Sequence, residues 1–99
     1  MDKSVISIES VAITFSQNLI RKGFTKRSLR YFRPYQCSGV IYTNREVLGL
    51  VLVGELLIEI EDSQSIFEQG GEFFLPSNVY FQATAGDIGA HFLFARQRV

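Results

Sequence analysis

The sequence predicts an all-β protein, built as one antiparallel barrel or as two packed antiparallel sheets, in a single domain over residues 1–99. Short apolar runs rich in β-branched and aromatic residues recur at close spacing, and turn residues separate them. No window keeps the period of a helix. The chain is 46% hydrophobic and 13% aromatic with no net charge, which suffices for one core and excludes a disordered chain.

The candidate strands are the runs that combine apolar β-forming residues with a turn signal at their ends. In chain order they are residues 5–8, 11–15, 28–32, 39–42, 47–53, 55–61, 65–68, 72–75, 80–83 and 91–95. The turn signals between them are Asn18, Gly23, Pro34, Asn44, Asp62 with Ser63, Gly70 with Gly71, residues 76–78, and Gly86 with Asp87. The stretch 15–22 also allows one helical turn. The runs within residues 1–20 are expected to be N-terminal strands that cover the sheet or exchange with a second copy.

Alternation assigns the faces of the central runs. Leu56, Ile58 and Ile60 alternate with residues that include three glutamates, so the run 55–61 has a dry inner face and a mostly wet outer face. The run 47–53 is apolar on both faces and must be covered on both sides.

Two covers for the second face stay open at this stage. One is a partner subunit, because three leucines on a flat sheet make a patch that monomers seldom expose. The other is the chain's own N-terminal segment 5–8, and a swapped N-terminal strand would satisfy both. The last run is also apolar on both sides, apart from its histidine. The expected homodimer interface therefore consists of Leu48, Leu50, Leu52, Phe92 and Leu93.

Charge is unevenly distributed along the chain. Six basic residues and no acid lie between positions 21 and 33, whereas eight acids and no base lie between 46 and 87. Neighbouring basic and acidic strands would compensate each other. The alternative is a contact surface for an acidic partner, made by Lys26, Arg27, Arg30 and Arg33. The balanced total disfavours nucleic acid as a partner.

One cysteine excludes an internal disulfide, and no signal peptide or membrane span is recognised. We therefore expect an intracellular protein with no membrane partner.

The segment 70–81 resembles the second motif of the cupin barrels, which runs Gly, five residues, Pro, one residue, Gly, two residues, His. Gly70 and Pro76 match its spacing, Asn78 stands at the second Gly, and Phe81 stands at the metal-binding His. The resemblance spans about residues 39–96 and implies a cupin-type antiparallel jelly-roll barrel.

The same alignment implies a barrel without a metal. The positions of the cupin metal ligands correspond to Val40, Tyr42, Val47 and Phe81, which would line the barrel pocket instead. A metal site needs converging imidazole and carboxylate ligands. We expect no cofactor, no metal and no assigned catalytic residue.

Among metal-free cupins, the chain is most similar to the C-terminal domain of the centromere protein C family. The shared features are an aromatic residue at Phe81, the Gly-rich turn and Phe-x-x-Pro of residues 70–76, and the final strand of residues 93–99. The resemblance implies a homodimer that binds other proteins, at the barrel or the basic segment, and a nuclear, centromeric location. Without that role, a cytoplasmic location is expected.

The alternative is a small cupin enzyme or sensor that acts on a small molecule, similar to the pyrimidine/purine nucleoside phosphorylases. The barrel interior distinguishes the two. A protein-binding module should have an apolar, largely filled barrel, whereas an enzyme or sensor should show polar groups converging on a pocket.

Overall fold

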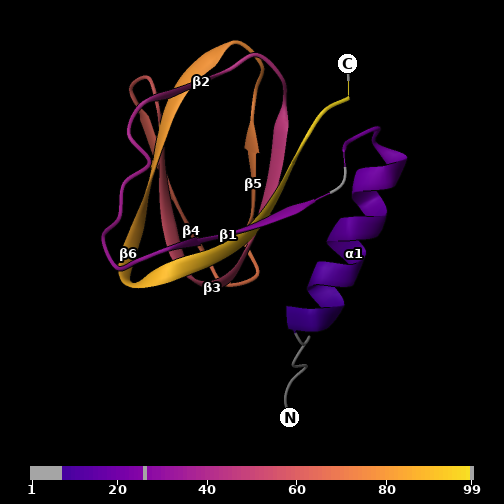
Figure 1. Ribbon diagram of the computed structural model, residues 1–99, viewed down its shortest axis with the longest axis horizontal. Helices are drawn as coiled ribbons and strands as arrows, with labels where there is room; N and C mark the ends of the chain where they lie inside the picture. Colours follow the sequence, from indigo (N-terminus) through magenta and orange to yellow (C-terminus); the bar gives the residue numbers. More distant parts are fainter. Residues whose placement is uncertain (1–7, 26, 99) are drawn as a thin grey trace.

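The computed structural model describes residues 8–25 and 27–98 and shows a bent antiparallel sheet with one helix beside it (Figure 1). In chain order the elements are α1 (Ile8–Arg21), β1 (Ser28–Phe32), β2 (Ile41–Thr43), β3 (Val47–Ile60), β4 (Ser63–Glu68), β5 (Glu72–Leu75) and β6 (Val79–Arg96). The strand order is β1-β6-β3-β4, with β2 paired to β6 and β5 paired to β3. Every pairing is antiparallel, and the sheet curls into a barrel.

Two long strands form the frame of the barrel. The predicted runs 47–53 and 55–61 are the two halves of β3, and the runs 80–83 and 91–95 belong to β6. β3 bends at Gly54, where φ is +79° and where the register against β6 shifts. A Cβ at Gly54 would overlap the carbonyl oxygen of Gly89. Glycine is therefore required there both by the backbone conformation and by the close approach of the two strands.

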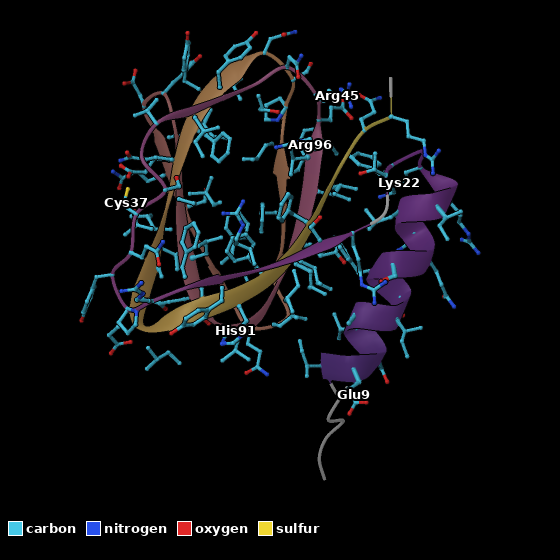
Figure 2. The ribbon with its side chains drawn as sticks, viewed as in Figure 1. Glu9, Lys22, Cys37, Arg45, His91 and Arg96 are labelled. Atoms are coloured by element: carbon cyan, nitrogen blue, oxygen red, sulfur yellow. The ribbon has the colours of Figure 1, made fainter. Side chains whose placement is uncertain are left out.

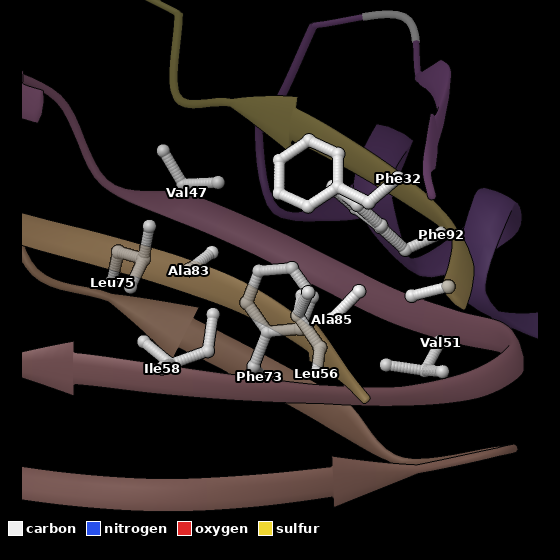
Figure 3. Close-up of a cluster of buried hydrophobic side chains, with 11 residues drawn as sticks. Phe32, Val47, Val51, Leu56, Ile58, Phe73, Leu75, Ala83, Ala85 and Phe92 are labelled. Atoms are coloured by element: carbon white, nitrogen blue, oxygen red, sulfur yellow. The ribbon is translucent and has the colours of Figure 1, made fainter. Parts of the chain in front are cut away.

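Alternation along the strands points apolar side chains into the barrel interior, as the sequence indicates. Leu56 and Ile58 are buried and Ile60 packs against the same cluster. The side chains point toward one another from several strands (Figure 3). The buried cluster consists of Phe32, Val47, Val51, Leu56, Ile58, Phe73, Leu75, Ala83, Ala85, Ala90 and Phe92. Gly49 leaves the space that the Phe73 ring occupies, since a Cβ there would overlap the ring.

The expected strand 11–15 is wrong, because these residues form the middle of α1. Val11, Ala12, Phe15 and Leu19 recur at helical spacing and pack on the outer face of the sheet. The expected run 5–8 lies outside the described residues, except that Ile8 begins the helix.

α1 covers the leucine face of β3. Leu50 is 0% exposed and shares a cluster with Phe15, Leu19 and Leu93, and Leu48 and Leu52 pack against that cluster. The cover is thus the chain's own helix 8–21, whereas the segment 5–8 expected to cover this face lies, apart from Ile8, outside the described residues.

This cover changes the expected dimer interface. Leu50 and Leu93 are buried in one cluster with Phe15 and Leu19 of α1, and Leu48 and Leu52 pack against that cluster. Phe92 belongs to the barrel interior. The reason for expecting an interface here was an uncovered apolar face, and in the described structure that face is covered.

Gly23 ends the helix. The Phe24 amide donates to the Leu19 carbonyl at 2.9 Å, and the Gly23 amide donates to the Ile20 carbonyl at 3.2 Å. With φ at +75° for Gly23, this is a Schellman end, and the contact between Phe24 and Leu19 in the buried cluster completes it. The turn sends the chain back along the sheet into β1. No helix within residues 8–25 and 27–98 has the length and apolar content needed to cross a membrane.

Candidate functional site

The barrel interior contains a cavity of about 590 Å³. Its apolar wall includes Phe32, Leu56, Phe73 and Phe92, which come from β1, β3, β5 and β6. Polar residues from the segment between β1 and β3, among them the buried Thr43, and from the end of β6 complete the lining. A volume of this size falls within the range of small-molecule pockets.

Three arginines and no carboxylate line this cavity among the described residues. Arg30 lies on the inward face of β1, Arg45 lies in the turn between β2 and β3, and Arg96 is the last residue of β6. The whole chain carries equal numbers of acids and bases. The concentration of positive charge at the cavity is therefore local, and apolar walls strengthen its field.

Backbone pairing brings Arg45 and Arg96 close together. Val47 pairs with Arg96 across β3 and β6, and the Gln97 amide donates to the Glu46 carbonyl at 2.8 Å. Figure 2 shows Arg45 and Arg96 near each other, with Cys37 across the barrel from them. Within the described part of the chain, neither guanidinium has a hydrogen-bond or ion-pair partner.

The turn that carries Arg45 is fixed by a buried threonine. The Thr43 hydroxyl donates to the Arg45 carbonyl at 2.7 Å and accepts from the Arg45 amide at 3.3 Å. Arg30 is held differently, since its guanidinium lies 5.9 Å from the centroid of the Phe94 ring. Phe94 and Arg96 are two residues apart on β6 and therefore share a face of that strand. Arg30, Arg45 and Arg96 all line the same cavity.

The tyrosine expected in the pocket lies at its rim. The Tyr42 hydroxyl donates to Asn78 Oδ1 at 2.9 Å, and the ring is tilted against Tyr80 with centroids 5.0 Å apart. Asn78 has φ of +62°, and its backbone amide donates to the Thr43 carbonyl at 2.7 Å. Asparagine thus takes the left-handed turn position, which it tolerates better than most residues.

The opposite wall carries the single cysteine. Cys37 Sγ lies 3.8 Å from Gln82 Oε1, and the Gly39 amide points to the sulfur at 3.4 Å. The neighbouring Ser38 hydroxyl accepts from the Ala83 amide at 3.0 Å, which fastens this segment to β6.

Three of the four expected pocket residues line the cavity, namely Tyr42, Val47 and Phe81. The expectation for Val40 is wrong, because its side chain is 70% exposed and does not line the cavity. β2 begins one residue later, and Ile41 pairs with Phe81 across the sheet. In this part of the chain, Ile41 and the buried Thr43, both of β2, line the cavity, and Val40 does not.

The arginines of the cavity were missed as a site, although alternation could have placed two of them. Phe92, Phe94 and Arg96 are two residues apart on β6 and share one face of it, and Arg30 shares a face of β1 with Phe32. Arg45 lies in a turn, and no periodicity gives its direction.

The contact surface expected from four basic residues stays a prediction. Arg30 lines the barrel cavity, whereas Arg27 lines a small hollow beside the end of α1. Arg33 is exposed and lines neither, and Lys26 lies outside the described residues.

Metal ligands do not converge in the part of the chain that the structure describes, where no group of three or more His, Cys, Asp or Glu side chains is found. The lining of the cavity contains neither a histidine nor a carboxylate among the same residues. The expectation that the protein takes no metal stays a prediction.

Comparison with known proteins identifies the fold. No family model matches the chain, and neither does any curated protein. Among solved structures, the cupin domain of Schizosaccharomyces pombe Cnp3 is 11% identical with a TM-score of 0.67, and the match covers 74% of this chain and 52% of that one. Drosophila melanogaster CENP-C bound to CAL1 is 16% identical with a TM-score of 0.65, covering 72% of this chain and 63% of that one.

A cupin enzyme matches equally well. A structure of the DMSP lyases RdDddP and RnDddQII is 20% identical with a TM-score of 0.68, and the match covers 74% of this chain and 38% of that one. The aligned part thus spans between about a third and two thirds of these solved chains. At such identities the likeness concerns the fold, and it includes both protein-binding domains and enzymes. The chain has the cupin fold, an antiparallel jelly-roll barrel.

Proposed function

We propose that this cupin barrel binds a small molecule in its central cavity. The observation that carries the proposal is the cavity itself, about 590 Å³ with polar groups converging on an apolar wall. A barrel that served only to present an outer surface to a protein would gain stability from a filled interior, since empty space in a core forfeits packing contacts. Of the two functions that the sequence left open, the interior favours the small-molecule enzyme or sensor.

An uncharged fluorescent probe tests the proposal without assuming a charge on the ligand. N-phenyl-1-naphthylamine should bind with a stoichiometry near one per chain. Ala83→Phe should abolish this binding, because Ala83 is buried and lines the cavity. Thr84→Phe is the matched control, since alternation places Thr84 on the other face of β6.

Ala83→Leu provides a milder version of the test, and amide chemical shifts provide a mapping that needs no variant. Thermal melts establish that each variant folds. Probe binding that survives in both Ala83 variants, or shift changes confined to α1 instead of Phe81 and Ala83, would exclude the cavity as a binding site.

A second candidate function is homodimerisation and protein binding, as in a centromere protein C-like module. The supporting observation is an exposed row on the outer face, where Tyr31 pairs with His91 across β1 and β6 and His91 pairs with Val53 across β6 and β3. The Tyr31 and His91 rings are tilted against each other at 4.6 Å. A dimer through Leu48, Leu50 and Leu52 would instead require exchange of α1 between two copies.

Molar mass in solution distinguishes these candidates. A dimer that Tyr31→Ser converts to a monomer would favour protein binding through the outer face. A dimer unaffected by Tyr31→Ser but lost when α1 is truncated would favour exchange of the helix. A nuclear location would be expected only with this second candidate.

A further inference from the structure

We infer that the ligand of the cavity is a small organic anion: an apolar body that ends in a carboxylate or phosphate group. The inference rests on the proposed function and adds the chemical class of the ligand.

The first argument is electrostatic. Arg30, Arg45 and Arg96 bring three positive charges to the lining, and no carboxylate offsets them among the described lining residues. Arginine stays protonated at any physiological pH, so the charge is permanent. Nearby positive charges repel each other, and an anion between them removes that repulsion. A cationic ligand would increase it.

The second argument concerns hydrogen bonds. Neither Arg45 nor Arg96 has a side-chain partner within the described part of the chain. A guanidinium offers donors in a fork that matches the two oxygens of a carboxylate or a phosphate. The short turn at Thr43 and the pairing of Val47 with Arg96 hold the backbone of both arginines. The backbone positions of both arginines are therefore fixed before the ligand arrives, which lowers part of the cost of binding.

The third argument concerns the body of the ligand. Most of the remaining lining is made of aliphatic and aromatic side chains, among them Leu56 and Phe73. A free inorganic anion would leave this apolar lining without a contact. An amphiphilic molecule would contact both the arginines and the apolar lining, with its charged group at the arginines and its apolar body in the barrel.

The test compares molecules that share a body and differ in the head group. 4-Phenylbutyrate and 3-phenylpropyl phosphate are the anionic arms, 4-phenyl-1-butanol is the neutral arm and 4-phenylbutylamine is the cationic arm. Titration calorimetry on the full chain should show at least one anion binding roughly tenfold tighter than the alcohol. The amine should bind more weakly than the alcohol. The ranking of the two anions distinguishes a carboxylate ligand from a phosphate ligand.

Variants assign the preference to the proposed residues. Arg96→Gln and Arg45→Gln should each weaken the preferred anion by roughly tenfold and leave the alcohol unchanged. Arg33→Gln is the control for general surface charge, because Arg33 is exposed and does not line the cavity. Thermal melts verify folding.

The possible outcomes separate the two proposals. If the alcohol binds as tightly as the anions and Ala83→Phe blocks both, the cavity binds small molecules but the inferred anion class is wrong. If Arg33→Gln weakens the anions as much as Arg96→Gln, the preference comes from overall charge and the inference fails. If no arm binds and the uncharged fluorescent probe also fails, the proposed function itself is wrong.

Discussion

Replacing Phe15 with alanine should detach α1 or unfold the protein. Phe15 is 2% exposed and lies in the cluster that joins the helix to Leu50 and Leu93. A buried Phe→Ala change costs about 3–5 kcal/mol through lost burial and the cavity left behind. A protein of this size is stable by only about 5–15 kcal/mol. The variant should therefore lose a large part of its free energy of unfolding.

Urea unfolding followed by circular dichroism measures that loss, and Ile20→Ala is the matched control. Ile20 lies on the same helix but is 81% exposed, so its truncation should change the free energy of unfolding by less than about 0.5 kcal/mol. Equal losses in the two variants would show that α1 does not pack on the sheet as described. If the urea curve of Phe15→Ala keeps the main unfolding transition but lacks an earlier transition seen in the unchanged protein, the helix detaches from a barrel that stays folded.

Three further predictions concern glycines, the rim and metals. Gly54→Ala should destabilise far more than Gly70→Ala in thermal melts, since both have positive φ but only a Cβ at Gly54 meets backbone, at Gly89; equal costs would contradict this packing. Tyr42→Phe should lower the free energy of unfolding by about 0.5–1.5 kcal/mol by removing the hydrogen bond to Asn78, and an unchanged urea midpoint would show that this bond contributes nothing. Elemental analysis of the purified protein should find far less than one transition metal per chain, and near-stoichiometric metal would refute the metal-free expectation.

The leucine face provides one more test of the covering helix. Leu50→Glu would place an unpaired charge beneath α1, where Leu50 is fully buried. We expect a strongly lowered melting temperature or aggregation. An unchanged melting temperature would mean that α1 leaves this face readily and that the residue is available to a partner.

Alternation predicted most of the barrel from the sequence. Leu56, Ile58 and Ile60 face inward as their spacing indicates, and the strands at residues 28–32 and 72–75 have the expected bounds. Two pairs of predicted strands are continuous in the structure, because a glycine such as Gly54 can bend a strand without ending it.

The helix could not be predicted from alternation. Val11, Ile13 and Phe15 read as a β-forming run, yet Ile13 is 59% exposed and only part of the run faces the sheet. Packing against Leu50 determines the conformation here, and β propensity is too weak to oppose it. The better signal was Gly23, whose place after the last apolar residue is typical of a helix end.

The cavity was predictable in its walls but not in its charge. The cupin resemblance predicts that Val47 and Phe81 line the cavity. Arg96 could be placed there as well, because it shares a face of β6 with Phe92 and Phe94. Arg45 depends on how the turn after β2 meets the end of β6, through the bond between the Gln97 amide and the Glu46 carbonyl. Such a contact between distant segments leaves no local pattern.

The position of α1 on the sheet also constrains the order of folding. The helix is synthesised before the strands, but the surface that it covers includes Leu93 and Ala95, which lie far downstream of it. During synthesis its apolar face therefore has no complete site to dock on, and isolated helices of this length are marginal in water. We expect the β3–β6 pairing to form from Ile60 and Phe81, the closest partners in sequence, toward the other end, and α1 to dock last. The apolar face of α1 would then be the part of the nascent chain that most needs a chaperone.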